Sequence, residues 1–334
     1  MSAALMPEEL YFLVLLRHGL AETCPPAPPS ALRGRVLFDL ARRQHLESLI
    51  LRALERRADT PTSLLHALEQ VRVLDMERAR LQTEAAERVL TLLPDCLPLR
   101  GIVLRELYPE PHLRHMTDLD FWVAHEDLAR ATALLCAEGY SLYAQKADES
   151  VLTAPPCLCV ELHARLDGIP RGREDGMRAR AADGRLRAAD FYAALLTHFA
   201  KHLRAAGAGA RFILDIGLYG GAYGSFADTD LARSAETLYA AWMSGVELDT
   251  TQLAFSKYLL SGTALGGSVQ RETNELAQSG GRLSHFLRLL GRPRYIFSRL
   301  FAKDSRARLR LRDNLSVSKA EMRERRKLFQ DLGL

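Results

Sequence analysis

Long hydrophobic runs are absent from this 334-residue chain. No stretch approaches the roughly 18 apolar residues that a membrane-spanning helix requires. The first 20 residues have no basic start and carry Glu8 and Glu9 inside their apolar stretch, which argues against a signal peptide. We therefore expect a protein without a membrane span, and by default a cytoplasmic one.

Cysteine is also scarce. The five cysteines are odd in number and irregularly spaced: Cys24, Cys96, Cys136, Cys157 and Cys159. Only the last two are close, and no second pair or histidine cluster lies near them to complete a tetrahedral zinc site. Buried thiols in a reducing compartment are therefore favoured over a zinc site.

The common catalytic signatures are missing as well. The chain contains no phosphate-binding P-loop, no nucleophile elbow of the G-x-S-x-G type and no dinucleotide fingerprint. His198 and His202 stand four residues apart, but without the glutamate of H-E-x-x-H they do not indicate a zinc protease. The functional residues must therefore lie outside these known motifs.

Positive charge is concentrated at the end of the chain. Residues 282–334 hold 15 Lys and Arg against 5 Asp and Glu, whereas the rest holds 30 basic and 36 acidic residues. Such a tail suits an anionic partner, meaning nucleic acid, phosphates or an anionic surface. A solvated, arginine-rich helix face is the alternative interpretation.

Apolar spacing predicts an α+β fold, in which a small mixed β-sheet core is embedded in a predominantly helical protein. We divide the chain into a helical region 1–93, an α/β core 94–168 and a helical region 169–334 that includes the basic tail. In the first region we expect one helix over roughly 35–57 and a long one from Thr62 towards Leu93. In the last, Gly217, Gly220, Gly221 and Gly224 predict a loop or kink.

The α/β core contains two informative strands. Thr117–Ala124 alternates polar and apolar residues before it becomes aromatic and β-branched, and Leu158–Leu162 is a second short strand. Because side chains alternate across a strand, Asp118 and Asp120 are expected to share one face. Two adjacent carboxylates repel each other unless a cation lies between them, and their oxygens suit Mg²⁺ or Mn²⁺. An isolated D-x-D motif is weak evidence, since most such pairs are merely exposed to solvent.

Glu161 strengthens that interpretation. It lies in an otherwise apolar strand, where a carboxylate is costly without a partner. That partner is either a metal ion shared with the aspartates or an arginine. His163 is expected on the same face and becomes a supporting candidate.

These residues belong to a longer ordered pattern. The chain reads Leu99-Arg100-Gly101, then Leu107-Tyr108, Arg114, Asp118-Leu119-Asp120-Phe121-Trp122-Val123, Gly139-Tyr140 and Val160-Glu161-Leu162-His163. His198, Lys201, His202 and Asp215 follow at a distance. Over about residues 90–220 this order resembles the uncharacterised nucleotidyltransferase-like proteins of the polymerase-β superfamily.

The resemblance implies transfer of a nucleoside monophosphate from a nucleoside triphosphate to an acceptor. It implies that Asp118, Asp120 and Glu161 are the catalytic residues and bind Mg²⁺ or Mn²⁺. Two departures matter. Ile102 follows Gly101 where the wider superfamily offers serine or glycine, and Arg100 replaces the usual lysine. Arginine can hold a phosphate through two hydrogen bonds, so Arg100 can still provide the positive charge that the lysine would place at the phosphates.

Further residues are candidates for binding the nucleotide. Arg100, Gly101, Arg105 and His163 are expected near the phosphates, and Arg114 binds triphosphate or pairs with a carboxylate. His198, Lys201 and His202 share one helix face, where they bind nucleotide or acceptor or pack against another helix.

Three functions remain open at this stage. The first is an active nucleotidyltransferase with an unidentified acceptor. A small molecule or a peptide or protein hydroxyl is favoured over an RNA end, since no nucleic-acid-binding motif is present. The second is a catalytically inactive binding or scaffold protein on the same fold, suggested by Ile102. The third is a nucleic-acid-modifying protein that uses the basic tail.

Overall fold

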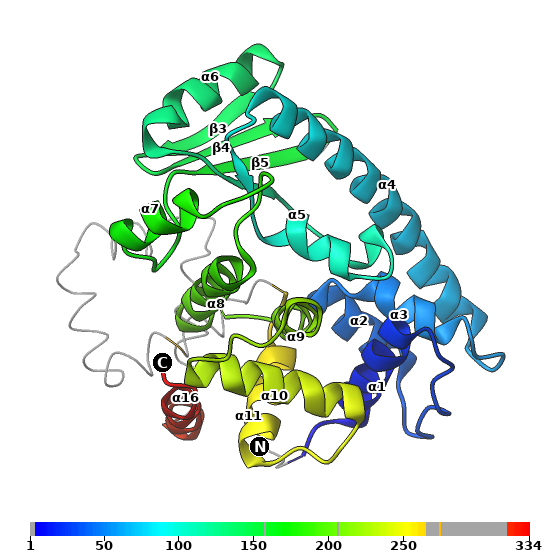
Figure 1. Ribbon diagram of the computed structural model, residues 1–334. Helices are drawn as coiled ribbons and strands as arrows, with labels where there is room; N and C mark the ends of the chain where they lie inside the picture. The colour runs from blue at the N-terminus through cyan, green and yellow to red at the C-terminus, as the bar shows by residue number, and fades with distance from the viewer. Residues whose placement is uncertain (1–3, 157, 206, 265–273, 275–318) are drawn as a thin grey trace, which may run out of the picture. The chain divides into compact units, whose positions relative to one another are not determined.

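The computed structural model describes residues 4–156, 158–205, 207–264, 274 and 319–334. Helices dominate, and the described strands form one five-stranded mixed sheet, which confirms the predicted α+β class (Figure 1). Within the described part of the chain, no helix is both long and apolar enough to cross a membrane.

The N-terminal helices confirm the long helix and correct the one before it. The helices are α1 (Pro7–Ala21), α2 (Gly34–Gln44), α3 (Glu47–Leu54) and α4 (Thr62–Leu92). The single helix expected over 35–57 is wrong, because it is two helices separated at His45, whose φ of 52° is left-handed. The apolar spacing continues across this break, so the sequence pattern conceals it. Helix α3 packs between α1 and α4.

The sheet has the order β1-β2-β5-β4-β3. Its strands are β1 (Leu97–Pro98), β2 (Leu119–Trp122), β3 (Ser141–Lys146), β4 (Glu149–Ala154) and β5 (Leu158–His163). Strands β2 and β5 pair in parallel, and the other neighbours are antiparallel. The predicted strand 117–124 is shorter than expected, because Asp118 precedes the first hydrogen-bonded residue, Leu119.

The two faces of this sheet differ in chemistry. Leu119, Phe121, Val160 and Leu162 alternate onto one face and are almost fully buried. They form a core with α4 and with α6 (Leu128–Ala137), which follows the short 3-10 helix η3 (His125–Asp127). After α6 the backbone reverses at Gly139, whose φ of 94° suits a glycine that ends a helix. The opposite face of the sheet carries the charged residues.

Short elements lead from α4 into the sheet and away from it. Between β1 and β2 lie α5 (Arg100–Leu104) and two 3-10 helices, η1 (Arg105–Leu107) and η2 (Pro111–Leu113). After β5, the helix α7 (Arg171–Ala179) was not expected from its glycine-containing and charged sequence. It places Arg178 over the ring of Trp122, with 4.2 Å from the guanidinium carbon to the ring centroid.

The later helices are α8 (Ala188–Arg204), α9 (Arg211–Tyr223), α10 (Asp230–Ser244), α11 (Thr250–Ser261) and α16 (Lys319–Asp331). A loop at the glycines is wrong for Gly217, Gly220 and Gly221, which lie inside α9. The alternative, a kink at these residues, stays a prediction. The helix ends only at Gly224, with a φ of 92°. Stacked aromatic side chains, such as Phe191 on Tyr219 at 4.8 Å between ring centroids, hold α8 against α9 and offset the low helix propensity of glycine.

The chain divides into two compact units. One contains Pro7–His198 and Asp215–Phe226, and thus the whole sheet. The other contains Met1–Met6, Phe199–Leu214 and Ala227–Leu334; its interior includes Trp242, which donates a hydrogen bond to Ser256 at 3.0 Å. The three sequence regions 1–93, 94–168 and 169–334 stay a prediction. Of the basic tail, residues 282–318 lie outside the described part of the chain.

Candidate active site

Strand register brings three polar side chains together on the charged face of the sheet. Asp120 of β2 lies directly beside Glu161 of β5, and His163 follows two residues later on the same face of β5. The residues between them, Phe121 and Leu162, point into the core and anchor both strands. The alternation of apolar and charged residues therefore directs the apolar side chains into the core and places the cluster on the other face of the sheet.

The three side chains are close enough to share one ion. The His163 Nε2 atom lies 2.8 Å from Asp120 Oδ1 and 3.4 Å from Glu161 Oε2. One ligand atom from each of the three residues lies within 4.8 Å of the others. Asp120 and His163 are buried and Glu161 is half-buried, so the cluster opens outwards on the Glu161 side.

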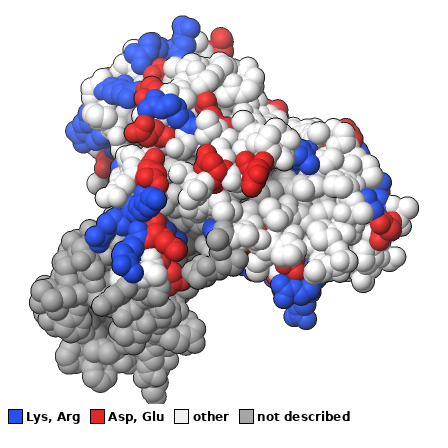
Figure 2. Space-filling view, turned by 90° about the horizontal axis from the view of Figure 1, so that it is seen from below, with Lys and Arg blue, Asp and Glu red and all other residues white. Residues whose placement is uncertain are grey.

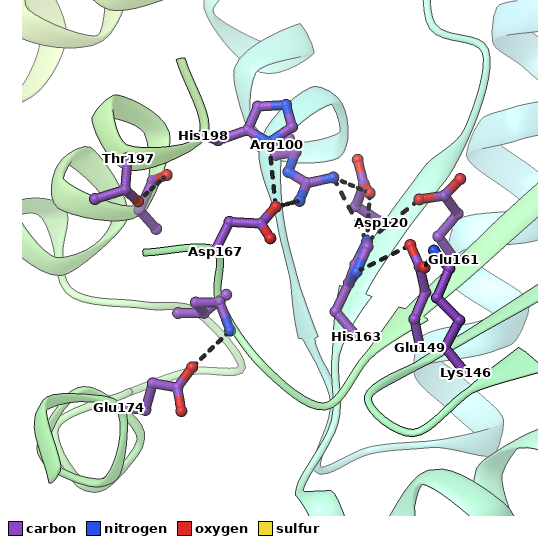
Figure 3. Close-up of polar contacts among 12 residues, drawn as sticks. Arg100, Asp120, Lys146, Glu149, Glu161, His163, Asp167, Glu174, Thr197 and His198 are labelled. Atoms are coloured by element: carbon purple, nitrogen blue, oxygen red, sulfur yellow. Dashed lines mark hydrogen bonds and ion pairs between the residues drawn. The ribbon is translucent and has the colours of Figure 1, made fainter. Parts of the chain in front are cut away.

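Arg100 lies against this cluster. Its Nη1 is 2.5 Å from Asp120 Oδ1 and 3.5 Å from His163 Nε2 (Figure 3). The Arg100 backbone is left-handed, with a φ of 42°, a conformation that non-glycine residues seldom adopt. Such strain persists only where the surroundings enforce it, and it is often found at functional sites.

The cations around Asp120 control its charge. Burial alone would raise the pKa of this carboxyl, but Arg100 and His163 outweigh burial and hold the pKa well below its usual range. Burial likewise would lower the pKa of His163, but hydrogen bonds with Asp120 and Glu161 raise it to about 9. At neutral pH the site therefore contains an ionised Asp120 beside a protonated His163.

A second layer of charges surrounds the cluster, and the sequence analysis did not identify it. Figure 3 shows Asp167 on the far side of Arg100, where its Oδ2 lies 3.7 Å from Arg100 Nη2 and 3.8 Å from His198 Nδ1. Glu149 lies beside His163 through the β4–β5 register, with its Oε1 3.8 Å from His163 Nδ1, and forms an ion pair with Lys146. The pairing of strand 149–154 with β5 would have been the signal for Glu149.

The other expected carboxylate and the later helix residues have different positions. Asp118 is half-buried and immediately precedes β2; it is not part of the three-residue cluster, and its role as a metal ligand stays a prediction. His198 lies near Asp167 in the unit that holds the sheet. Lys201 and His202 follow on α8 but belong to the other unit, so their nucleotide-binding role also stays a prediction.

Of the two roles expected for Arg114, the structure shows pairing with a carboxylate. Its Nη2 lies 2.8 Å from Asp215 Oδ2, and both side chains are buried. Tyr108 donates a further hydrogen bond to Asp215 Oδ1 at 2.9 Å. Burial would lower the pKa of Arg114, but Asp215 outweighs it and raises the pKa. This pair joins the segment before β2 to α9, and it explains the Asp215 of the sequence pattern.

Gly101 and Arg105 both contact other parts of the chain closely. A Cβ atom at Gly101 would lie 2.2 Å from Met116 Sδ and 2.6 Å from Arg114 Nη1, so glycine is required there by close packing. The Arg105 guanidinium is directed at α4, where it hydrogen-bonds to Gln82 Oε1 at 2.5 Å and to the Ala79 carbonyl at 3.3 Å. These contacts support a packing role for both residues, and their role in nucleotide binding stays a prediction.

The donor set at the cluster fits a divalent cation. Two carboxylates provide hard oxygen ligands, which Mg²⁺ and Mn²⁺ prefer. The imidazole of His163 in its neutral form would also suit Mn²⁺ or Zn²⁺. Because His163 is protonated near neutral pH, a metal ion on its nitrogen would have to displace a proton. The four described cysteines are free thiols, and none of them belongs to the cluster.

Comparison with known proteins identifies a family. The model of a family described as "Uncharacterised nucleotidyltransferase" matches residues 32–246, which is more than half of the chain. The matched segment includes the complete sheet and every site residue discussed above. Neither a curated protein nor a solved structure matches the chain. The chain therefore belongs to this uncharacterised nucleotidyltransferase family, and it is assigned to the enzymes that transfer nucleotidyl groups.

Proposed function

We propose that the chain transfers a nucleoside monophosphate from a nucleoside triphosphate to an acceptor, with Mg²⁺ or Mn²⁺ as cofactor, in the manner of the polymerase-β superfamily. The observation that carries the proposal is the cluster of Asp120, Glu161 and His163 beside Arg100. Family membership supports the reaction class, and the donor chemistry of the cluster supports the metal ion.

Each charged residue receives a role in this proposal. Asp120 and Glu161 hold the metal ion, and Asp118 adds a third carboxylate from the residue before β2. When bound, the ion neutralises the phosphate charge and stabilises the charge that develops during phosphoryl transfer. Arg100 provides a guanidinium that can hold the triphosphate through two parallel hydrogen bonds.

His163 acts as a positioning residue. Its imidazolium contacts Asp120 and Glu161 at once, so it fixes the relative orientation of two carboxylates on adjacent strands. Asp167 does the same for Arg100 and His198. Positioning by such supporting contacts commonly changes metal affinity or activity by about 10- to 100-fold.

A small molecule or a peptide is favoured over RNA as the acceptor. Apart from the basic tail, the sequence offers no nucleic-acid-binding motif. On the face seen in Figure 2, basic and acidic side chains of the described residues are interspersed, with wide uncharged areas between them. The phosphate backbone of RNA binds more strongly to a continuous basic surface.

A catalytically inactive binding protein is the second candidate, and two observations favour it. Asp120 Oδ1 already contacts two cations, Arg100 and His163, so this carboxylate has its charge balanced by the chain itself. Ile102 and the packed surroundings of Gly101 also leave no hydroxyl group for the phosphates. In such a protein the cluster would stabilise the sheet and would not turn over a nucleotide.

Calorimetric titration distinguishes the two candidates. ATP, GTP, CTP and UTP are titrated, with and without Mg²⁺, into the wild type and into an Asp118→Ala/Asp120→Ala double variant. Asp39→Ala, at an exposed position on α2, is the matched control. We expect Mg²⁺-dependent binding of one nucleotide in the wild type and the control, and its loss in the double variant. Equal binding by all three proteins would remove the carboxylates from the proposal, and binding without turnover would favour the second candidate.

A further inference from the structure

A pocket of about 590 Å³ lies on the face of β2 opposite the carboxylates. It is bounded by α4, by residues of the segment from Pro94 to Ile102 and by the turn at Asp183–Arg185. Its wall is mainly apolar, with Leu90, Ile102, Met116 and Leu119 among the lining residues. The volume lies in the range of sites that bind small molecules.

Arg105 gives this pocket a buried positive charge. The side chain lines the pocket, and only 7% of the residue is exposed. Its hydrogen-bond acceptors, Gln82 Oε1 and the Ala79 carbonyl, are neutral, and its Nε has no hydrogen-bond partner among the described residues. Burial and, to a lesser extent, the neighbouring charge of Arg114 together lower the pKa of Arg105 to about 10.

A buried cation without an anionic partner is costly to the fold. In the described part of the chain, no carboxylate lies within ion-pair distance of Arg105, unlike Arg114 with Asp215 and Arg100 with Asp120. Breaking or omitting one half of a buried ion pair typically costs several kcal/mol. An anionic group that enters the pocket would supply the missing partner.

The mouth of the pocket limits which anion can enter. Glu106 and Arg185 neutralise each other there through two contacts of 2.6 Å. Arg185 is held in place by the tight turn at Asp183 and Gly184, which both have a positive φ, as Asp-Gly turns favour. The remaining charged lining residues, Glu87 and Asp183, are exposed carboxylates. They would repel a polyanion such as a triphosphate.

We propose that this pocket binds an amphipathic organic monoanion, whose single carboxylate lies beside Arg105 and whose apolar chain or ring contacts Leu90, Ile102 and Met116. The ligand is separate from the nucleotide, since alternation along β2 places Leu119 and Asp120 on opposite faces. The site does not depend on the proposed reaction.

The test uses octanoate as the anionic probe and 1-octanol as its neutral counterpart, titrated calorimetrically into the full chain. We expect saturable octanoate binding with one site per chain, and octanol binding about 10- to 100-fold weaker, as the loss of one charge-assisted contact predicts. Arg105→Met keeps the apolar stem and should weaken octanoate binding by the same factor while leaving octanol unchanged. Arg130→Met, on the exposed side of α6, is the control and should bind both probes as the wild type does.

A second variant guards against misfolding of Arg105→Met. Thr83 is exposed on α4 and lines the pocket, so Thr83→Trp should fill the pocket and abolish binding of both probes. Its Mg²⁺-dependent nucleotide binding should equal that of the wild type. The proposal is overturned if the wild type does not bind octanoate, if octanol binds equally well, or if Thr83→Trp binds octanoate normally.

Discussion

The Arg114–Asp215 and Arg100–Asp120 pairs both lie in the unit that holds the sheet, and they differ in how completely they are enclosed. Arg114 and Asp215 have side chains that are 8% and 2% exposed, and Tyr108 completes their hydrogen bonds. Arg100 is 18% exposed, and its partner Asp120 also contacts His163, which lies beside a Glu161 side chain that is 22% exposed. The closed pair has no capacity for a ligand, whereas the open pair belongs to a cluster that can exchange partners.

The difference shows that an arginine next to an aspartate does not by itself form a functional site. Both pairs connect residues far apart in sequence and both use a buried aspartate. Only the open one places further ligand atoms within reach of a common ion. Variants of the two pairs should therefore separate loss of function from loss of stability.

Asp120→Asn should give the largest functional effect. It keeps the side-chain size but removes a negative charge from the cluster, which should weaken Mg²⁺-dependent nucleotide binding by on the order of 10²–10³-fold, since a metal ion contributes several kcal/mol in such sites. Titration of the preferred nucleotide measures this. Asp215→Asn, the matched change in the closed pair, should leave the affinity of the folded protein within about threefold.

Asp215→Asn should instead give the largest loss of stability. Removing one charge of a buried pair leaves Arg114 uncompensated, and the free energy of unfolding should fall by about 3–5 kcal/mol. Urea unfolding followed by circular dichroism measures it. The double variant Arg114→Met/Asp215→Leu should recover much of the loss, because neither charge then remains buried. A fall of less than about 1 kcal/mol for Asp215→Asn would mean that the pair is not the structural contact that its burial indicates.

These pairs also show which contacts can be predicted from the sequence and which cannot. The clustering of Asp120, Glu161 and His163 was predictable, because strand alternation and a local apolar pattern determine which face each residue occupies. The partners of Arg100, Arg105 and Arg114 were not, because they depend on contacts such as Arg114–Asp215, separated by 101 residues. Local pattern also failed where packing overrides it, as at His45 and at the glycines inside α9.

Glu47 extends the comparison to a buried carboxylate with no ion pair among the described residues. Burial raises the pKa of Glu47 to about 7, opposite to the lowered pKa of Asp120. The unfolded pKa lies near 4.5, so the stability this residue provides is complete below about pH 4.5 and is lost as the pH rises to about 7.

Glu47→Gln should remove this pH dependence. At pH 8 the variant should be more stable than the wild type by about 1–3 kcal/mol, and at pH 4.5 the two should be equal. Urea unfolding at both pH values measures the difference. An equal difference at both pH values would show that ionisation of Glu47 is not its cause.

The smallest expected effect tests the backbone of the open pair. Arg100→Ala and Arg100→Gly both remove the guanidinium from Asp120, but only glycine adopts a φ of 42° without strain. The glycine variant should therefore be more stable than the alanine variant by about 1 kcal/mol, the usual cost of a left-handed conformation. Thermal and urea unfolding of the two variants measure it, and the shared loss of the side chain cancels in their difference. Equal stability would mean that the backbone relaxes once the side chain is gone, so that contacts with Asp120 and Asp167 alone impose the left-handed conformation of Arg100.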